Sequence, residues 1–160
     1  MKKMVCALMA VVLLLAGTAC EKEPEKEPSF PATVTTQALL DSGAFSEQLE
    51  ELDLDIAVMM FWLSGDVSEY EGSKVYCSTG ATSEIAAVIS VRDESKVPEV
   101  EQALKAWVES QIEAEKDYRP AEVPKLENAI VEARGFTVLL AVANDAEKAM
   151  DAIETVVAEK

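Results

Sequence analysis

Apolar residues recur along the chain at two different spacings, which predict strands and helices in a fixed order. Residues 75–79 and 85–91 alternate along the chain with the period of two that is typical of strands, and Gly80 provides a turn between them. Residues 97–118 instead place an apolar residue every three or four positions, which predicts a long amphipathic helix with Pro98 in its first turn. The polar face of this helix is expected to carry Glu101, Glu109, Glu113 and Glu115 in water.

The same order of elements returns in the second half of the chain. Residues 129–134 and 136–143 have the pattern of two strands joined at Gly135, and Asn144 and Asp145 then cap a final helix. The chain therefore contains two β-β-α units. The predicted fold class is α+β: a mainly antiparallel four-stranded sheet with both helices on one face, plus an N-terminal helical segment, all in one domain over residues 35–160.

The most apolar stretch between residues 21 and 160 is 56–63, which contains Met59, Met60, Phe61 and Trp62. Asp53 and Asp55 precede it as capping residues, and we predict a helix, although eight apolar residues are also compatible with a buried strand. Packing in the core is the simpler interpretation of these side chains. The alternative is a methionine and aromatic contact surface for a hydrophobic partner.

The first twenty residues have the parts of a bacterial lipoprotein signal peptide. Two lysines are followed by thirteen uncharged residues, Met4 to Ala16, and then by small residues directly before Cys20. We expect Cys20 to be the lipid acceptor, carrying diacylglycerol and an acyl chain such as palmitate. Gly17 stands where this signal usually has an aliphatic residue, so ordinary secretion or an uncleaved anchor are the alternatives.

Residues 21–34 are rich in proline, glutamate and lysine and repeat the letters EKEP. Such a composition does not bury a core and resists helix formation, so we expect an extended tether. The predicted location is the cell membrane, with the domain held by its lipid on the extracytoplasmic side.

The charge of the chain excludes one class of partner. The full chain has a formal net charge of −16, and removal of residues 1–20, which contain two lysines and no acids, leaves −18. Nucleic acids are polyanions and are therefore disfavoured partners.

The sequence contains no recognisable catalytic or cofactor-binding motif. It has no histidine, no paired CxxC, no phosphate-binding glycine loop and no calcium loop, so we predict no cofactor, no metal site and no enzymatic activity. Cys77 is the single thiol left after the signal and the lipid-bearing cysteine. Carboxylates are abundant, but most fall on the polar faces of helices or in the tether.

One connector in this acidic chain combines cationic and aromatic groups. Tyr118, Arg119 and Lys125 lie around two prolines after the long helix, and connectors often carry binding residues. We consider them a candidate surface for an envelope protein or peptide partner. The simpler interpretation is that Tyr118 closes the helix and Lys125 pairs with a nearby glutamate.

The segments EIAAVISVRD and DYRPAEVPKLENAIVEARGFTVLLAVANDAEKA resemble a family of small bacterial lipoproteins that carry a domain of unknown function. The family is found mostly in Gram-positive gut bacteria, and the similarity covers roughly residues 35–155. Its most specific positions are Tyr118, Pro120, Lys125, Leu126, Asn128, Ala129, Gly135 and Asp145. The resemblance implies a lipid-anchored extracytoplasmic domain and no catalytic residues.

Three functions follow as hypotheses. The preferred one is a non-catalytic binding or interaction module that is anchored at the cell envelope. The second is a carboxylate-based hydrolase of wall or glycan, which requires two carboxyl groups about 5–10 Å apart in a pocket. The third is an anionic accessory protein that binds cationic peptides or divalent ions by charge.

Overall fold

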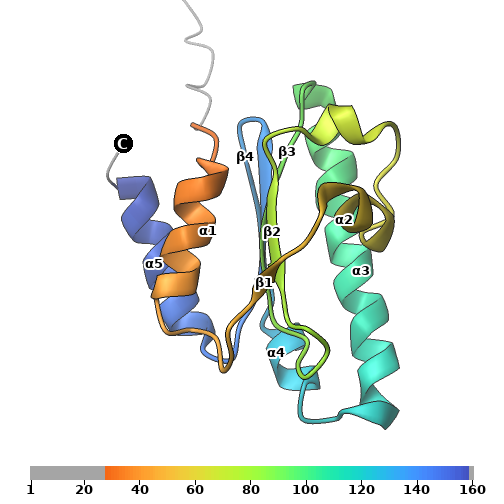
Figure 1. Cartoon of the computed structure of the whole chain (residues 1–160), viewed down its shortest axis with the longest axis vertical. Coiled ribbons are helices and arrows are strands. Elements are labelled where there is room, and N and C mark those ends of the chain that lie inside the picture. The colour runs from red at the N-terminus through yellow and green to blue at the C-terminus, as the bar shows by residue number, and fades with distance from the viewer. Residues whose placement is uncertain (1–27, 159–160) are drawn as a thin grey trace, which may run out of the picture.

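A five-stranded antiparallel sheet lies at the centre of the molecule, and the computed structural model describes residues 28–158 (Figure 1). The strands follow the spatial order β1-β2-β3-β5-β4, so that β3 and β5 are central. Their bounds are β1 Glu50–Glu51, β2 Lys74–Cys77, β3 Ile85–Ser90, β4 Ile130–Arg134 and β5 Thr137–Val142. The register places Ala87 between Val75 of β2 and Leu140 of β5.

Helices cover both faces of this sheet (Figure 1). One face carries α1 (Ala32–Asp41) and α5 (Ala146–Ala158), which pack against each other. The opposite face carries α3 (Val97–Tyr118) together with the short helices α2 (Leu54–Met60) and α4 (Val123–Glu127). Two 3-10 turns, Val67–Tyr70 and Glu94–Lys96, complete the regular structure of the described part.

The central strands separate two hydrophobic clusters. Ala87 and Ile89 of β3 face α3, whereas Ala86 and Val88 of the same strand face α1 and α5. On the α3 side, Phe61 meets Trp107 edge to face, with ring centroids 5.3 Å apart. Since successive side chains of a strand point to opposite faces, a strand that is apolar at every position is buried from both sides.

The predicted fold class is confirmed at the level of α+β and of two β-β-α units, and two details were wrong. The sheet has five strands, because β1 adds an edge strand of only two residues, both exposed glutamates that give no apolar signal. The two long helices lie on opposite faces, because β3 and β5 present apolar side chains on both faces and each face needs a cover.

The packed domain begins earlier than residue 35. Phe30 is only 3% exposed, its backbone N–H donates a hydrogen bond of 2.9 Å to Thr137 Oγ1, and α1 starts at Ala32. Phe30 thus packs in the core, and residues 32–34, assigned to the tether from the sequence, belong to α1. The signal, Cys20 and residues 21–27 lie outside the described residues. Within residues 28–158, none of the helices combines the length and the apolar character that crossing a membrane requires.

Candidate functional site

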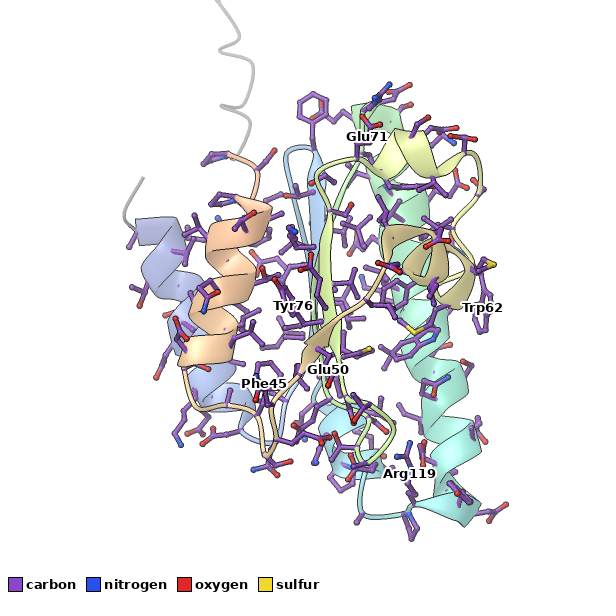
Figure 2. All side chains as sticks on the ribbon, in the orientation of Figure 1. Phe45, Glu50, Trp62, Glu71, Tyr76 and Arg119 are labelled. Carbon is purple, nitrogen blue, oxygen red and sulfur yellow. The ribbon has the colours of Figure 1, made fainter. Side chains whose placement is uncertain are left out.

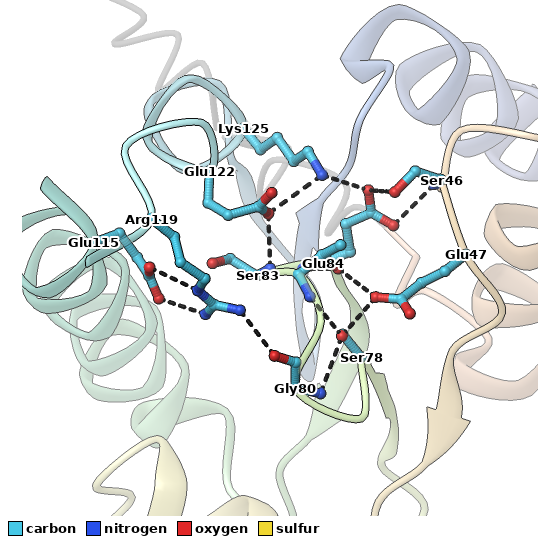
Figure 3. Close-up of polar contacts among 11 residues, drawn as sticks. Ser46, Glu47, Ser78, Gly80, Ser83, Glu84, Glu115, Arg119, Glu122 and Lys125 are labelled. Atoms are coloured by element: carbon cyan, nitrogen blue, oxygen red, sulfur yellow. Dashed lines mark hydrogen bonds and ion pairs between the residues drawn. The ribbon is translucent and has the colours of Figure 1, made fainter. Parts of the chain in front are cut away.

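Ten residues from four segments form a polar network at one end of the sheet, which we call the junction (Figure 3). The segments are the connection from α1 to β1, the loop between β2 and β3, the C-terminal turn of α3, and α4. The junction consists of Ser46, Glu47, Ser78, Thr82, Ser83, Glu84, Glu115, Arg119, Glu122 and Lys125. It therefore ties together segments that are up to 79 residues apart in the chain.

Lys125 neutralises two buried carboxylates. Its Nζ lies 2.8 Å from Glu84 Oε1 and 3.2 Å from Glu122 Oε2. Glu84 is fully buried and also accepts hydrogen bonds from the backbone N–H and the hydroxyl of Ser46. Burial of Lys125 lowers its pKa, but the hydrogen bonds to Glu84 and Glu122 outweigh that effect, so that the pKa is raised overall and the ammonium stays charged.

Arg119 closes the C-terminal end of α3 onto the β2–β3 loop. Its guanidinium donates two hydrogen bonds to Glu115, at 2.8 and 2.5 Å, and a third of 3.0 Å to the carbonyl oxygen of Gly80. Glu115 is buried, contrary to the expectation that it faces water. The hydrogen bond from Arg119 is the main cause of a lowered pKa for Glu115. Such a bidentate pair of hydrogen bonds between a guanidinium and a carboxylate keeps both groups charged and fixes their relative orientation.

Glu47 holds the β2–β3 loop from the other side. Its Oε1 accepts hydrogen bonds of 2.6 Å from the hydroxyls of Ser78 and Thr82, which lower the pKa of the carboxyl. The Ser78 hydroxyl in turn accepts the backbone N–H groups of Gly80 and Thr82. The loop is therefore closed by side chains as well as by its own backbone.

The three candidate binding residues from the sequence are found in different situations. Lys125 is only 12% exposed in its side chain and is occupied by two glutamates, as the simpler interpretation expected. Arg119 is occupied by Glu115. Tyr118 is the last residue of α3, as the simpler interpretation expected, but its side chain is 80% exposed, and the Arg119 guanidinium lies 5.9 Å from the centroid of its ring. A binding role for this connector stays a prediction.

The junction can stabilise the fold, and its groups are poorly placed for acid–base chemistry. Two of its carboxylates, Glu84 and Glu122, share the ammonium of Lys125 instead of facing each other as free acid and base. Among residues 28–158, no group of histidine, cysteine, aspartate or glutamate side chains is arranged to hold a metal ion. Cys77 is half-buried, and burial raises the pKa of its thiol, so that little thiolate is present near neutral pH.

A second feature is an exposed apolar surface at α2 and the turn that follows it, the α2 patch, made of Ile56, Met59 and Trp62. The side chains of Met59 and Trp62 are 67% and 58% exposed, and Ile56 is exposed as well. Figure 2 shows Trp62 at the outer margin of the molecule, beside α2. Their neighbours in sequence, Ala57, Val58 and Phe61, are buried in the core on the α3 side. Residues 56–63 are thus helical as far as Met60 and supply both core and surface.

Trp62 occupies a backbone conformation that usually belongs to glycine. Its φ of 55° lies in the left-handed region, and it is the one residue other than glycine with positive φ among residues 28–158. The Leu63 N–H bonds to the carbonyl of Val58 and the Trp62 N–H to that of Met59, which together form a Schellman motif at the end of α2. A bulky residue in this position costs about 1–2 kcal/mol relative to glycine.

Carboxylates without a basic partner surround the α2 patch along the chain. Asp53 and Asp55 stand at the start of α2, and Asp66 follows Trp62 at the start of the next 3-10 turn. All three are exposed, and none forms an ion pair with another described residue. The α2 patch is therefore an apolar surface in a negative field.

The sequence indicated some of these features and not others. The alternation of apolar residues could not reveal Glu84, which follows a polar loop and pairs with a lysine 41 residues away. The run at 56–63 did raise the possibility of a contact surface. The sequence feature that pointed to exposure of this run was its polar or small flanks, two aspartates before it and Ser64 and Gly65 after it.

Comparison with known protein families identifies the family of this chain. The sequence model of a family described as "Domain of unknown function (DUF4358)" matches residues 59–143. The matched segment begins within α2 and runs to the residue after β5, so it includes Trp62, the β2–β3 loop, α3, α4 and four of the five strands. No curated protein and no solved structure matches the chain.

Proposed function

Because the chain belongs to the family of domains of unknown function DUF4358, which carries no assigned activity, we propose its role from its own residues. It is a lipid-anchored, extracytoplasmic and non-catalytic binding module of the cell envelope, and the α2 patch is its contact surface. The observation that carries this proposal is Trp62, an exposed indole in a conformation that disfavours it.

Tryptophan at residue 62 is disfavoured both by its backbone conformation and by its exposure. A glycine at residue 62 would satisfy the Schellman motif without strain, and a polar residue would suit its exposure. Tryptophan provides neither advantage, but it is among the residues that contribute most to binding energy at protein interfaces. Met59, next to it, is flexible and polarizable and adapts to partner surfaces.

The charge around the α2 patch supports a particular partner. Asp53, Asp55 and Asp66 would be left without counter-charges against an acidic protein, so the partner presents an apolar pocket with lysine or arginine at its rim. A cationic partner combines the preferred hypothesis, a non-catalytic interaction module, with one element of the third hypothesis, an acidic protein that binds cationic ligands. If the contact buries apolar area, raising the salt concentration should weaken the affinity only in part. If the contact depends on charge alone, the same increase in salt should abolish binding.

The anchor is supported by the sequence of residues 1–20. A domain with a net charge of −18 is repelled by anionic headgroups, so durable attachment needs a lipid of more than one chain. The chain enters the domain at α1 on one face of the sheet, whereas α2 lies on the opposite face. This arrangement leaves the α2 patch accessible when α1 is directed toward the membrane.

Trp62→Gly tests the contact surface without unfolding the domain. We expect the free energy of unfolding to stay within about 1 kcal/mol of the wild type, because relief of the left-handed strain offsets the loss of partial burial. Partners that co-purify with the full chain from solubilised membranes should fall at least tenfold. Val34→Ser, at an equally exposed apolar position on α1, is the matched control and should retain them. Equal recovery with both variants would contradict the role of the α2 patch.

A further inference from the structure

The strand β4 forms one edge of the sheet, and within residues 28–158 no strand pairs with its outer side. Arg134 pairs with Thr137 across a two-residue turn, so this closing pair and every second pair after it exchange hydrogen bonds with β5. The backbone N–H and C=O groups of Val131 and Ala133 consequently point away from the sheet. Neither residue forms a backbone hydrogen bond outside the ladder with another described residue.

An apolar groove runs beside this edge on the α3 face. Its volume is about 290 Å³, and its apolar walls come from Val108 and Ile112 of α3, Leu126 of α4, and Ala129 and Val131 at the start of β4. Side chains of an added strand alternate between the two faces of the sheet. A strand laid along β4 would therefore direct every second side chain toward this groove.

The rim of the groove is negative. Glu109 and Glu127 are exposed on it, and neither forms an ion pair with another described residue. Lys105, the basic residue of the lining, is bound to Glu101 one turn away on α3. Two carboxylates are thus available to a basic ligand.

We propose that β4 and the groove bind an extended peptide segment as a sixth strand. The segment carries an aliphatic side chain that enters the groove and a lysine or arginine two residues away on the same face, which meets Glu109 or Glu127. Backbone hydrogen bonds to Val131 and Ala133 supply affinity, and the groove and its carboxylates supply selectivity. This peptide site is separate from the proposed contact surface at α2, which lies toward the opposite edge of the sheet.

A second copy of the chain fits this edge less well than a basic peptide does. Two chains of net charge −16 repel each other. Antiparallel pairing of β4 with itself about its central residue would also place Glu132 directly opposite Glu132, and like charges in that position are destabilising.

The probe for this site is a ten-residue fluorescent peptide in which one face alternates lysine, valine and lysine and the other is threonine. We expect saturable binding to the full chain in detergent, with slowed amide exchange at Val131 and Ala133. Methylation of the peptide nitrogens that face β4 should weaken binding at least tenfold, because it removes the main-chain donors without changing charge. Binding that is insensitive to this methylation, or no saturable binding, would overturn the proposal.

Charge reversal on the protein separates this site from general attraction to an acidic surface. Glu109→Lys with Glu127→Lys should weaken the peptide at least tenfold. Asp151→Lys with Glu154→Lys changes the net charge equally on exposed positions of α5, across the sheet, and should change binding less than twofold. Equal loss of peptide binding in both double variants would indicate attraction by net charge and would reject the site. Dimerisation of the protein through β4, without peptide binding, would assign this edge to a second copy and would also reject the proposal. Trp62→Gly should leave peptide binding unchanged, so that failure of this proposal and failure of the α2 patch are distinguishable.

Discussion

At the scale of single residues, the buried charges of the junction have the largest consequences for stability. Among residues 28–158, Lys125 is the one cation paired with Glu84, which has no exposure to water, so the two groups must be present together. Removing one member of a buried pair is much more costly than removing an exposed pair, because the remaining charge stays desolvated.

Lys125→Met is therefore expected to lower the free energy of unfolding by about 3–5 kcal/mol. The measurement is urea-induced unfolding followed by circular dichroism. Lys105→Met removes a lysine from the exposed pair with Glu101 and should cost less than about 1 kcal/mol. Similar losses in the two variants would mean that water reaches Glu84 and that the junction is not a dry ion pair.

Residue-level chemistry was the least predictable part of this chain. The pairing of Lys125 with a nearby glutamate could be anticipated, since Glu122 is three residues away on the same helix. Its stronger contact with Glu84 depends on tertiary folding that local spacing does not encode. Tyr118 continues the apolar stripe of α3 in the sequence, but the end of α3 extends beyond the sheet (Figure 1), and Tyr118 is exposed there.

At the scale of elements, the order of strands and helices could be read from apolar spacing, whereas their placement could not be read from that spacing alone. The segments β3 and β5 read IAAVIS and TVLLAV, with apolar side chains on both faces. A sheet with one face in the core and the other face in water would carry both long helices on the same face, which is the arrangement predicted from the sequence. The composition of these two strands contained the opposite signal, since central strands covered on both sides are apolar throughout.

The β2–β3 loop is the element whose attachment depends most on pH. Glu47 and Glu115 hold it through hydrogen bonds from Ser78 and Thr82 and through Arg119, and both have a folded-state pKa below the ordinary value of 4.5. A lowered carboxyl pKa contributes stability that is fully present above the unfolded pKa and is lost as pH falls through the folded pKa. Acid is thus expected to loosen this end of the sheet.

Glu115→Gln provides the test of that expectation. The variant should be less stable than the wild type at pH 7, and the difference should shrink as pH is lowered below about 4.5, because protonation removes the same charge from the wild type. Unfolding curves at pH 7, 5, 4 and 3 measure it. Glu113→Gln, on the exposed face of α3, is the control and should show little difference at any pH. A difference for Glu115→Gln that stays constant from pH 7 to 3 would contradict the assignment.

At the scale of the whole molecule, the sheet divides the surface into regions with different roles. The α1 and α5 face receives the chain from its N-terminal segment, and the other face carries the α2 patch near one edge of the sheet and the groove beside β4 at the other. A module anchored by Cys20 would present both surfaces to partners outside the membrane. The acidic charge of the chain favours cationic partners for each of them.

The most direct test of the α2 patch as the contact surface is photo-crosslinking in intact cells. A benzophenone amino acid replaces Trp62 in the full chain, and in a parallel strain it replaces Val34. We predict a defined covalent adduct from residue 62, recovered with the membrane fraction, that is absent from residue 34. The same adducts from both positions, or none from residue 62 in membrane-held protein, would contradict the proposal that this domain binds its partner through Trp62.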